Sequence, residues 1–214
     1  MGRPIEVEWQ FEPRAPAAFR RWLVTARFED GWSLDRPEIA RLRDTYFDTV
    51  DWRVFRAGYA ARIRRSGARV ECTLKAVVPR RGGLAARREI TSRLADARLA
   101  SLVRSRGAVG ARIRNVVDGA PLRRLFAVST RRETFAVHHR GRVVAELALD
   151  DTSISSRARS TRLRRVEIEV LQGSPDRVAC FVATLRRGRH LTLARRSKFE
   201  ESLRTVRLTA PRPR

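Results

Sequence analysis

Like charges recur in this sequence in pairs two residues apart. The pairs are Glu6 with Glu8, Arg62 with Arg64, and Glu167 with Glu169. In a β-strand, residues i and i+2 point to the same face, so each pair would set two like charges side by side. Carboxylate pairs suit a divalent cation, and an arginine pair suits a polyanion such as a phosphate chain. Together the three pairs predict a site for a metal–phosphate complex.

Neighbouring segments continue this pattern. Residues 71–75 place Lys75 on a charged face opposite apolar side chains, and residues 145–150 place Glu146 and Asp150 together on another. For any one segment, a strand with its charged face in water is the simpler interpretation. Water-exposed faces usually mix Thr, Ser, Lys and Glu, whereas these hold carboxylates and guanidiniums almost alone. The set as a whole therefore favours an enclosed site.

The composition narrows the fold class and the partners. The chain has 214 residues and a formal net charge of +24, and it is long enough for one large domain or two small ones. All but two of its 47 basic residues are arginine, a skew typical of codon bias, and the two lysines are Lys75 and Lys198. Since no linker or repeat is evident, we expect one domain over residues 1–206 and a basic flexible tail over 207–214.

Other features limit the kind of partner. Arginine runs at 157–165 and 186–196 contain no interleaved aromatic residue and no zinc-finger spacing, which predicts nonspecific polyanion attraction without specific nucleic-acid recognition. No apolar run is long enough to span a membrane, and acidic residues from Glu6 onward argue against a signal peptide. Cys72 and Cys180 form no metal or redox motif, so we expect a cytoplasmic protein. For the oligomeric state, we expect either a monomer or a homodimer.

Periodicity and turn residues predict the elements that would position these charges. Helices are expected at 17–28, at 94–117 with a break near the glycines at 107 and 110, at 175–187 and at 197–206, and a helical turn at 51–56. Strands are expected at 4–11, 39–47, 59–65, 69–78, 84–91, 123–137, 142–150, 152–156 and 163–171.

These strands allow two architectures of the α+β class. One is an open sheet with a solvated outer face. The other is a closed eight-stranded antiparallel β-barrel, a tunnel with a charged lumen and helices packed on its outside. The apolar strand faces need cover, and the predicted helices carry apolar stripes that supply it. We favour the barrel, because its lumen charges would be neutralised by a metal–phosphate ligand.

The ordered motifs resemble those of the CYTH domain, the fold of the triphosphate tunnel metalloenzymes. The family's Glu-x-Glu-x-Lys signature is matched by residues 6–10, where Glu6 and Glu8 are followed by Gln10. The resemblance runs from about residue 5 to residue 203. Further matches follow in the family's order: 45–49, 62–64, 73–75, 87–89, Arg132, 146–150, 167–169 and 197–198.

This resemblance implies a tunnel that binds a triphosphate together with Mg²⁺ or Mn²⁺. It implies metal ligation by five carboxylates: Glu6, Glu8, Asp150, Glu167 and Glu169. It implies contacts to the phosphate chain by Gln10, Arg62, Arg64, Lys75, Arg87, Glu89, Arg132 and Lys198. Among all these residues, those expected to act in catalysis are Glu6, Glu8, Lys75 and Arg132.

The implied activity is metal-dependent hydrolysis, in which water attacks the terminal phosphate. The expected substrate is inorganic triphosphate or polyphosphate, a nucleoside triphosphate, or thiamine triphosphate. Two alternatives stay open: a class IV-type adenylyl cyclase of the same fold, and a non-catalytic polyphosphate- or nucleotide-binding module. The chain departs from the family pattern at Gln10, where the family has lysine, and at Thr91, where it has an acid. An amide can bond a phosphate oxygen but brings no charge, so these departures favour a weakened enzyme or a binder.

Overall fold

The computed structural model describes residues 5–77, 84–155, 159–187 and 191–211. The loop expected at 79–83 and the beginning of the arginine run at 157 lie outside these residues. Within them the chain forms ten strands: β1 (Ile5–Pro13), β2 (Trp32–Leu34), β3 (Glu38–Asp48), β4 (Tyr59–Ser66), β5 (Arg69–Ala76), β6 (Leu84–Arg93), β7 (Arg123–His139), β8 (Arg142–Ser155), β9 (Ser160–Val170) and β10 (Leu191–Leu193). The helices are α1 (Pro16–Thr25), α2 (Arg53–Arg56), α3 (Leu99–Arg104), α4 (Ala108–Val117), α5 (Pro175–Arg186) and α6 (Lys198–Val206).

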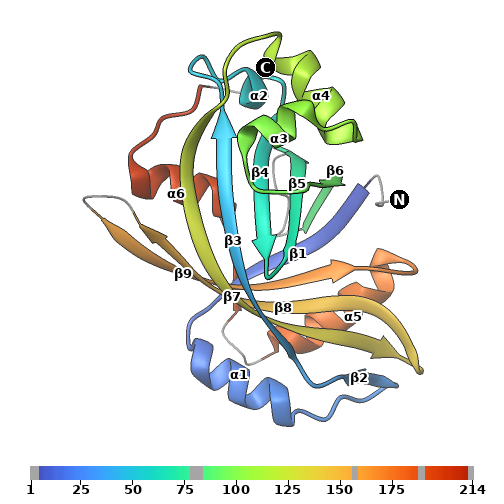
Figure 1. The fold of residues 1–214 in the computed structure, drawn as a ribbon. Coiled ribbons are helices and arrows are strands. Elements are labelled where there is room, and N and C mark those ends of the chain that lie inside the picture. The colour runs from blue at the N-terminus through green and yellow to red at the C-terminus, as the bar shows by residue number, and fades with distance from the viewer. Residues whose placement is uncertain (1–4, 78–83, 156–158, 188–190, 212–214) are drawn as a thin grey trace.

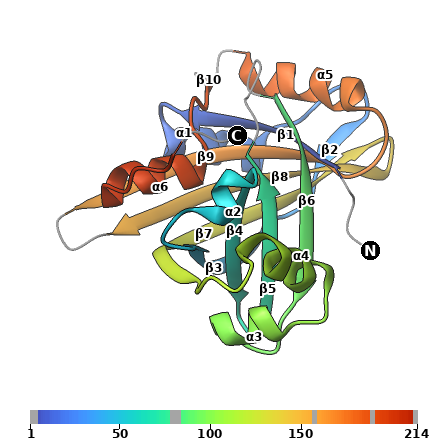
Figure 2. The same ribbon diagram turned by 90° about the horizontal axis from the view of Figure 1, so that it is seen from above.

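Eight of the strands close into a barrel (Figures 1 and 2). Their order is β1-β6-β5-β4-β3-β7-β8-β9, every neighbouring pair is antiparallel, and β1 also pairs with β9. The two three-residue strands lie outside this ring, β2 against β7 and β10 against β1. The closed eight-stranded barrel predicted from the sequence is confirmed, and the open sheet is not what forms.

The alternation of side chains divides each strand into a lumen face and an outer face. On β9, Glu167 and Glu169 line the central cavity, while Val166 and Ile168 are fully buried in the outer core. The same alternation sets Glu8 of β1 toward the lumen and leaves its neighbours to pack outside. One residue of register therefore decides whether a side chain meets a ligand or a helix.

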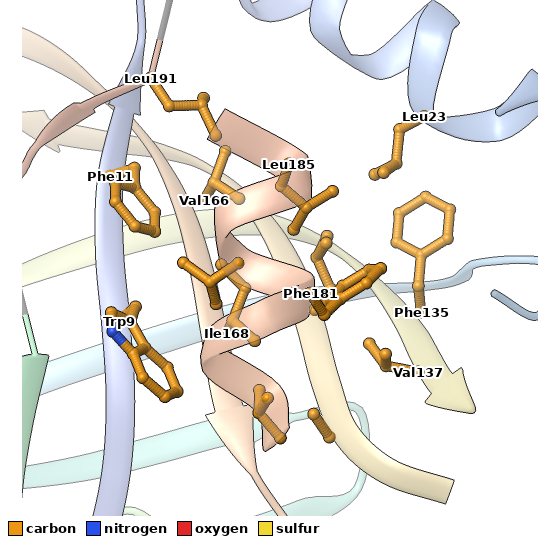
Figure 3. Packing of buried hydrophobic residues seen from close by; sticks show 14 of the residues in the cluster. Trp9, Phe11, Leu23, Phe135, Val137, Val166, Ile168, Phe181, Leu185 and Leu191 are labelled. Carbon is orange, nitrogen blue, oxygen red and sulfur yellow. The ribbon is translucent and has the colours of Figure 1, made fainter. Parts of the chain in front are cut away.

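Helices cover the apolar outer faces, as predicted. Phe181 and Leu185 of α5 pack on Val166 and Ile168 of β9 (Figure 3), and α1 adds Leu23 to the same cluster. On the opposite side of the barrel, α3 and α4 cover β4 and β5 (Figures 1 and 2). A third cluster joins α2 and α6 to β3 and β7.

Several boundaries differ from the sequence prediction. The break expected near Gly107 in the helical stretch 94–117 is found, since α3 ends at Arg104 and α4 begins at Ala108, whereas Gly110 lies inside α4. A Cβ at Gly107 would lie 2.7 Å from the Ser92 hydroxyl. The strand expected at 152–156 is the continuation of β8. Strands β2 and β10 were not predicted. In the expected tail, Leu208 and Ala210 pack against the third cluster.

Candidate functional site: the charged lumen of the barrel

The barrel encloses a cavity of about 330 Å³ whose wall is dominated by charge. Among the described residues that line it, seven are cationic and seven carry carboxylates. The cationic side chains are Arg62, Arg64, Lys75, Arg87, Arg132, Arg195 and Lys198. The carboxylates are Glu6, Glu8, Glu89, Glu146, Glu167, Glu169 and Glu200. The wall is therefore crowded with charge but formally balanced.

A row of three carboxylates crosses three adjacent strands, and together with Glu6 and Glu167 we call it the acidic wall. Glu169 of β9 lies directly opposite Glu8 of β1 on one side and Glu146 of β8 on the other. Burial, together with repulsion from Glu6, raises the pKa of Glu169 to about 7. Burial and the nearby Glu167 and Asp150 also raise the pKa of Glu146, although Arg132 opposes the shift. This part of the lumen holds more negative charge than its surroundings neutralise.

Beside this row, Lys75 is the centre of a second group of charges. Its ammonium lies 2.7 Å from Glu6 and 3.2 Å from Glu89, and Arg87 contacts both Glu6 and Glu8. Burial alone would lower the pKa of Lys75, but Glu6 and Glu89 outweigh it and raise that pKa. Lys75 therefore stays charged inside the barrel.

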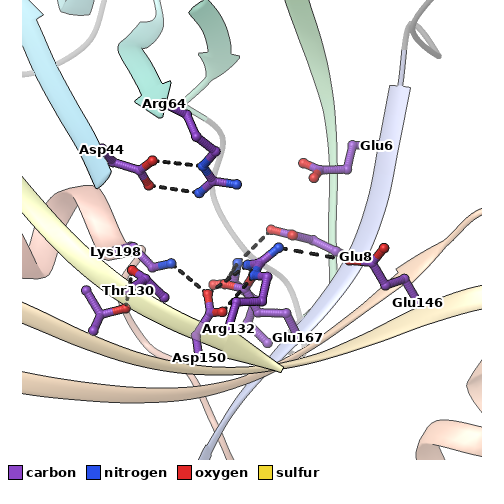
Figure 4. Close-up of polar contacts among 12 residues, drawn as sticks. Glu6, Glu8, Asp44, Arg64, Thr130, Arg132, Glu146, Asp150, Glu167 and Lys198 are labelled. Carbon is purple, nitrogen blue, oxygen red and sulfur yellow. Dashed lines mark hydrogen bonds and ion pairs between the residues drawn. The ribbon is translucent and has the colours of Figure 1, made fainter. Parts of the chain in front are cut away.

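Asp44 holds two arginines of the lumen in place. We call the cationic side of the cavity the basic wall, made of Arg62, Arg64, Lys75, Arg132 and Lys198. Arg64 donates two hydrogen bonds of 2.8 Å to the two oxygens of Asp44 (Figure 4), and Arg62 lies 3.6 Å from the same carboxylate. The Asp44 side chain is fully buried. Burial alone would raise its pKa, yet Arg62 and Arg64 hold that pKa well below its usual value. Both arginines are held beside Asp44 in this way, and both line the cavity.

Asp150 fixes a second basic pair. Its carboxylate accepts two 2.7 Å hydrogen bonds from Arg132 and one of 2.7 Å from Lys198 (Figure 4). Arg132 also donates a 2.6 Å hydrogen bond to Glu167. Against the effect of burial, Lys198 and Arg132 hold the pKa of Asp150 well below its usual value. Asp150 is fully enclosed by these contacts and does not line the cavity.

The position of Lys198 depends on the start of α6. Ser197 caps this helix, and Ser197 and Glu200 form a capping box, each accepting a hydrogen bond from the other's backbone N–H. Phe199 anchors the same turn by packing on Tyr46, with ring centroids 5.4 Å apart. The first turn of α6 is thereby fixed at the lumen, with Lys198 reaching in.

Gln10 lies between two carboxylates. Its amide nitrogen donates to Glu8 over 2.7 Å and to Glu167 over 3.1 Å. A carboxylate can only accept, so the amide orientation is fixed, and the Gln10 carbonyl oxygen is buried without a hydrogen-bond partner among the described residues. The other departure, Thr91, bonds Thr73 over 3.1 Å and is not part of the cavity wall.

The predicted site residues converge with one exception. Every one of them except Asp150 lines the cavity, which sets Asp150 behind the wall as the partner of Arg132 and Lys198. Their roles toward a ligand stay predictions. The sequence analysis did not assign Asp44, Glu146 or Arg195 to the site. Glu146 was visible on a charged strand face, whereas Asp44 shares its strand face with Leu42 and Tyr46 and gave no such signal.

The donor chemistry of the acidic wall fits a hard divalent cation, since its oxygens are carboxylates and one free amide carbonyl. In the described residues, no three Asp, Glu, His or Cys side chains stand in an arrangement that could hold a metal ion. The reason is visible in the contacts: Glu6, Glu8 and Glu167 turn to Lys75, Arg87 and Arg132. Metal binding here would require those carboxylates to exchange cationic partners for the ion.

A closed barrel with a lumen of paired acidic and basic strands defines the tunnel class of fold. A family model for the CYTH domain matches residues 4–203, and the chain belongs to that family. No curated protein matches the sequence. No helix within the described ranges has the length and apolar character needed to cross a membrane.

Solved structures share this fold at low sequence identity. HpAC1 from Hippeastrum, described as a putative adenylyl cyclase with a dominant triphosphatase activity, has a TM-score of 0.70 and 18% identity, over 94% of this chain and 96% of that one. A putative adenylate cyclase from Bacillus halodurans has a TM-score of 0.59 and 20% identity, over 93% and 98%. The PH1819 protein from Pyrococcus horikoshii OT3 has a TM-score of 0.57 and 17% identity, over 92% and 98%.

Proposed function

We propose that this protein hydrolyses a triphosphate bound in the lumen as a complex with Mg²⁺ or Mn²⁺. The observation that carries the proposal is the balanced wall, with seven cationic and seven acidic side chains around one cavity of about 330 Å³. A triphosphate alone would meet as much repulsion as attraction there. A triphosphate with divalent cations presents both signs of charge and matches both walls.

On the basic side, Arg62, Arg64, Lys75, Arg132 and Lys198 bind the phosphate oxygens. Asp44 and Asp150 hold four of these side chains in fixed positions before substrate arrives. Such preorganisation means that little reorientation is needed as charge builds up on the leaving phosphate. Gln10, Arg87 and Glu89 lie at the border of the two walls and help to fix the carboxylates and Lys75.

On the acidic side, we assign the metal to the row of Glu8, Glu169 and Glu146, with Glu6 and Glu167 beside it. A bound Mg²⁺ or Mn²⁺ neutralises phosphate charge and activates water. The carboxylates of the row supply the hard oxygen ligands that these ions prefer. We leave Asp150 out of this set because its oxygens are taken by Arg132 and Lys198.

The reaction follows from this arrangement. The oxygen of a water molecule forms a bond to the terminal phosphorus and gives up a proton, while the bond from that phosphorus to the bridging oxygen breaks. The diphosphate group leaves with the electron pair and takes up that proton. The guanidiniums and ammoniums of the basic wall stabilise the leaving oxygens. Because the barrel encloses them, these interactions are weakly screened by solvent.

The relatives support this reading at the level of the fold. HpAC1 is described as having a dominant triphosphatase activity, and the Bacillus halodurans protein as a putative adenylate cyclase. One observation favours an organic triphosphate as substrate, and with it the cyclase alternative: Tyr46 and Phe199 place two aromatic rings in the same cavity wall. In a cyclase the ribose 3′-hydroxyl would attack the α-phosphorus in place of water.

A product assay tests the proposal. Purified protein is incubated with inorganic triphosphate, ATP or thiamine triphosphate, with Mg²⁺, Mn²⁺ or a chelator. We expect phosphate release that needs the metal, and loss of most of it in Glu169→Gln with the fold retained. Glu29→Gln, which removes an exposed carboxylate, should match the wild type. Cyclic AMP with diphosphate would indicate the cyclase, and binding without turnover would indicate a non-catalytic module.

A further inference from the structure

The cavity wall includes one segment that is not a barrel strand. Residues 194–199 link β10 to α6 and form the beginning of that helix, and four of their side chains line the lumen: Arg195, Ser197, Lys198 and Phe199. We call residues 194–199 the linking segment. It brings side chains to the lumen that the alternation of the eight barrel strands does not supply.

Contacts to two strands hold the linking segment in place. The backbone N–H of Ala194 donates to the carbonyl of Gln10 in β1 over 3.0 Å. Arg165 of β9, whose side chain is 1% exposed, donates to the carbonyl of Arg196 over 2.8 Å. A guanidinium so deeply buried is costly to leave without its hydrogen bonds, so this contact resists movement of the segment. The backbone on both sides of Arg195 is therefore fixed.

Arg195 differs from the other cationic side chains of the lumen in its lack of an acidic partner. The other six each have a carboxylate within 4.0 Å: Arg62, Arg64, Lys75, Arg87, Arg132 and Lys198. Among the residues that the structure describes, no carboxylate lies that close to Arg195. The acidic residue of the same turn, Glu200, accepts the backbone N–H of Ser197 over 2.6 Å instead.

The charge of Arg195 decides the sign of the whole cavity wall. Without it, the described lining residues would present six cationic side chains against seven carboxylates. A highly charged anion such as triphosphate would then meet net repulsion. A guanidinium can bond two oxygens of one phosphate group at once. We propose that Arg195 is a substrate-binding residue, which draws the phosphate chain to the lumen and contacts it there. This rests on the function proposed above and adds to it a residue outside the basic wall.

The exposure of Arg195 determines which kinetic constant it affects. Its side chain is exposed, whereas Arg62 and Arg64 are mostly buried beside Asp44. A side chain that no carboxylate holds in one orientation contacts the substrate equally before and during the reaction. Loss of such a contact raises KM and leaves kcat unchanged. Salt screens interactions between exposed charges, so the effect on KM should shrink as the ionic strength rises.

A neighbouring arginine supplies the matched control. Arg195→Gln and Arg196→Gln each remove one positive charge from adjacent positions of the linking segment. The Arg196 side chain pairs with Glu201 over 3.3 Å and does not line the cavity, and such an exposed pair contributes little to stability. Hydrolysis of inorganic triphosphate with Mn²⁺ gives kcat and KM, calorimetric titration gives the affinity, and melting curves check the fold.

We expect Arg195→Gln to raise KM about tenfold at about 50 mM salt, as for loss of a hydrogen bond to a charged group, with kcat within about twofold of the wild type. At about 500 mM salt the rise in KM should be about threefold or less. Arg196→Gln should stay within about twofold of the wild type at both salt concentrations. Arg195→Lys keeps the charge and should restore most of the affinity.

Three results would overturn the inference. Equal rises in KM for Arg195→Gln and Arg196→Gln would show that total charge matters and position does not. An unchanged KM in Arg195→Gln would show that Arg195 does not contact the substrate. A lower melting temperature together with a lower kcat in Arg195→Gln, at unchanged KM, would assign Arg195 a structural role.

The wild-type protein tells the two proposals apart. If it hydrolyses triphosphate and Arg195→Gln matches it, this inference is wrong and the proposed function stands. If it binds triphosphate without hydrolysis, the affinities from calorimetry replace KM and carry the same expectations. If it neither binds nor hydrolyses triphosphate, the proposed function is wrong and this inference is wrong with it.

Discussion

Two regions of the same lumen treat buried carboxylates in opposite ways. Asp44 and Asp150 are enclosed by guanidinium and ammonium groups, which hold their pKa values well below the usual range. In the acidic row a few strands away, Glu146 and Glu169 face each other across β8 and β9 with raised pKa values. Burial acts in the same direction on all four. The difference comes from the guanidinium and ammonium groups that hydrogen-bond to the two aspartates, whereas among the described residues no ion pair shorter than 4.0 Å reaches Glu146 or Glu169.

This contrast separates positioning from binding. The carboxylates of the two aspartates are fully occupied by contacts within the protein. Their part toward a ligand is to hold the arginines and Lys198 in fixed positions. Of the row, Glu8 contacts Arg87 and Gln10, whereas Glu146 and Glu169 accept no hydrogen bond from a cationic side chain among the described residues, and an added cation would stabilise them. In the function proposed above, the first region keeps the lumen folded and the second binds the divalent cation that accompanies the triphosphate.

The largest expected effect comes from breaking the first region. Asp44→Asn leaves Arg62 and Arg64 close together without their shared carboxylate. Removing one partner of a buried ion pair costs about 3–5 kcal/mol, and we expect the lower end, about 3 kcal/mol, because the arginines retain some solvent contact. Urea denaturation at neutral pH measures the change. Asp151→Asn, which removes an exposed pair with Arg162, should cost at most about 1 kcal/mol.

The pH dependence of that difference checks its origin. The folded-state pKa of Asp44 is lowered, so its stabilisation is fully present above the unfolded-state pKa of about 4 and is lost as the pH falls toward the folded value. The gap between wild type and Asp44→Asn should therefore shrink as the pH is lowered below about 4. A gap that stays constant with pH would assign the loss to packing instead of charge.

The next effect concerns substrate instead of stability. Arg62→Ala removes a guanidinium of the basic wall, and we expect kcat/KM for triphosphate to fall about 100-fold, as for loss of one preorganised donor in an enclosed site. Arg65→Ala is the matched control, three residues on in the same strand with its side chain outside the barrel. Similar losses in the two variants would indicate diffuse attraction in place of a defined wall.

A smaller effect sharpens the contrast at the border of the two regions. Gln10→Lys would place an ammonium between Glu8 and Glu167, where the amide now donates. The added charge should tighten metal-free triphosphate binding about tenfold, within the range for a charged hydrogen bond, and should weaken binding of Mn²⁺ alone. Calorimetric titration measures both constants. If both stay unchanged, Gln10 does not adjoin the ligand.

The smallest effect is a gain. Glu146→Gln removes one charge of the acidic row, and relief of repulsion should raise stability in chelator by about 0.2–1 kcal/mol. The same variant should lose the rise in melting temperature that Mn²⁺ gives the wild type. Melting curves with and without Mn²⁺ report both changes. A loss of stability in chelator would show that Glu146 is already well partnered.

The sequence predicted the parts of this account that depend on local pattern. Alternation placed Glu6 and Glu8 on one face of their strand, and Glu167 and Glu169 on one face of theirs. Closure of the barrel then brought those two faces together. Partner choice depends on register between distant strands, so the enclosure of Asp150 by Arg132 and Lys198 could not be read from spacing. Strands of three residues, such as β2 and β10, carry too little periodicity to be detected.

The central claim is that the lumen binds a triphosphate much more tightly together with a divalent cation than without one. Calorimetric titration of inorganic triphosphate into the wild-type protein, in chelator and then in Mn²⁺, tests it most directly. We predict binding at least tenfold tighter with Mn²⁺, and loss of that gain in Glu169→Gln. Equal affinity with and without the metal would contradict the account, because the acidic row would then have no part in binding.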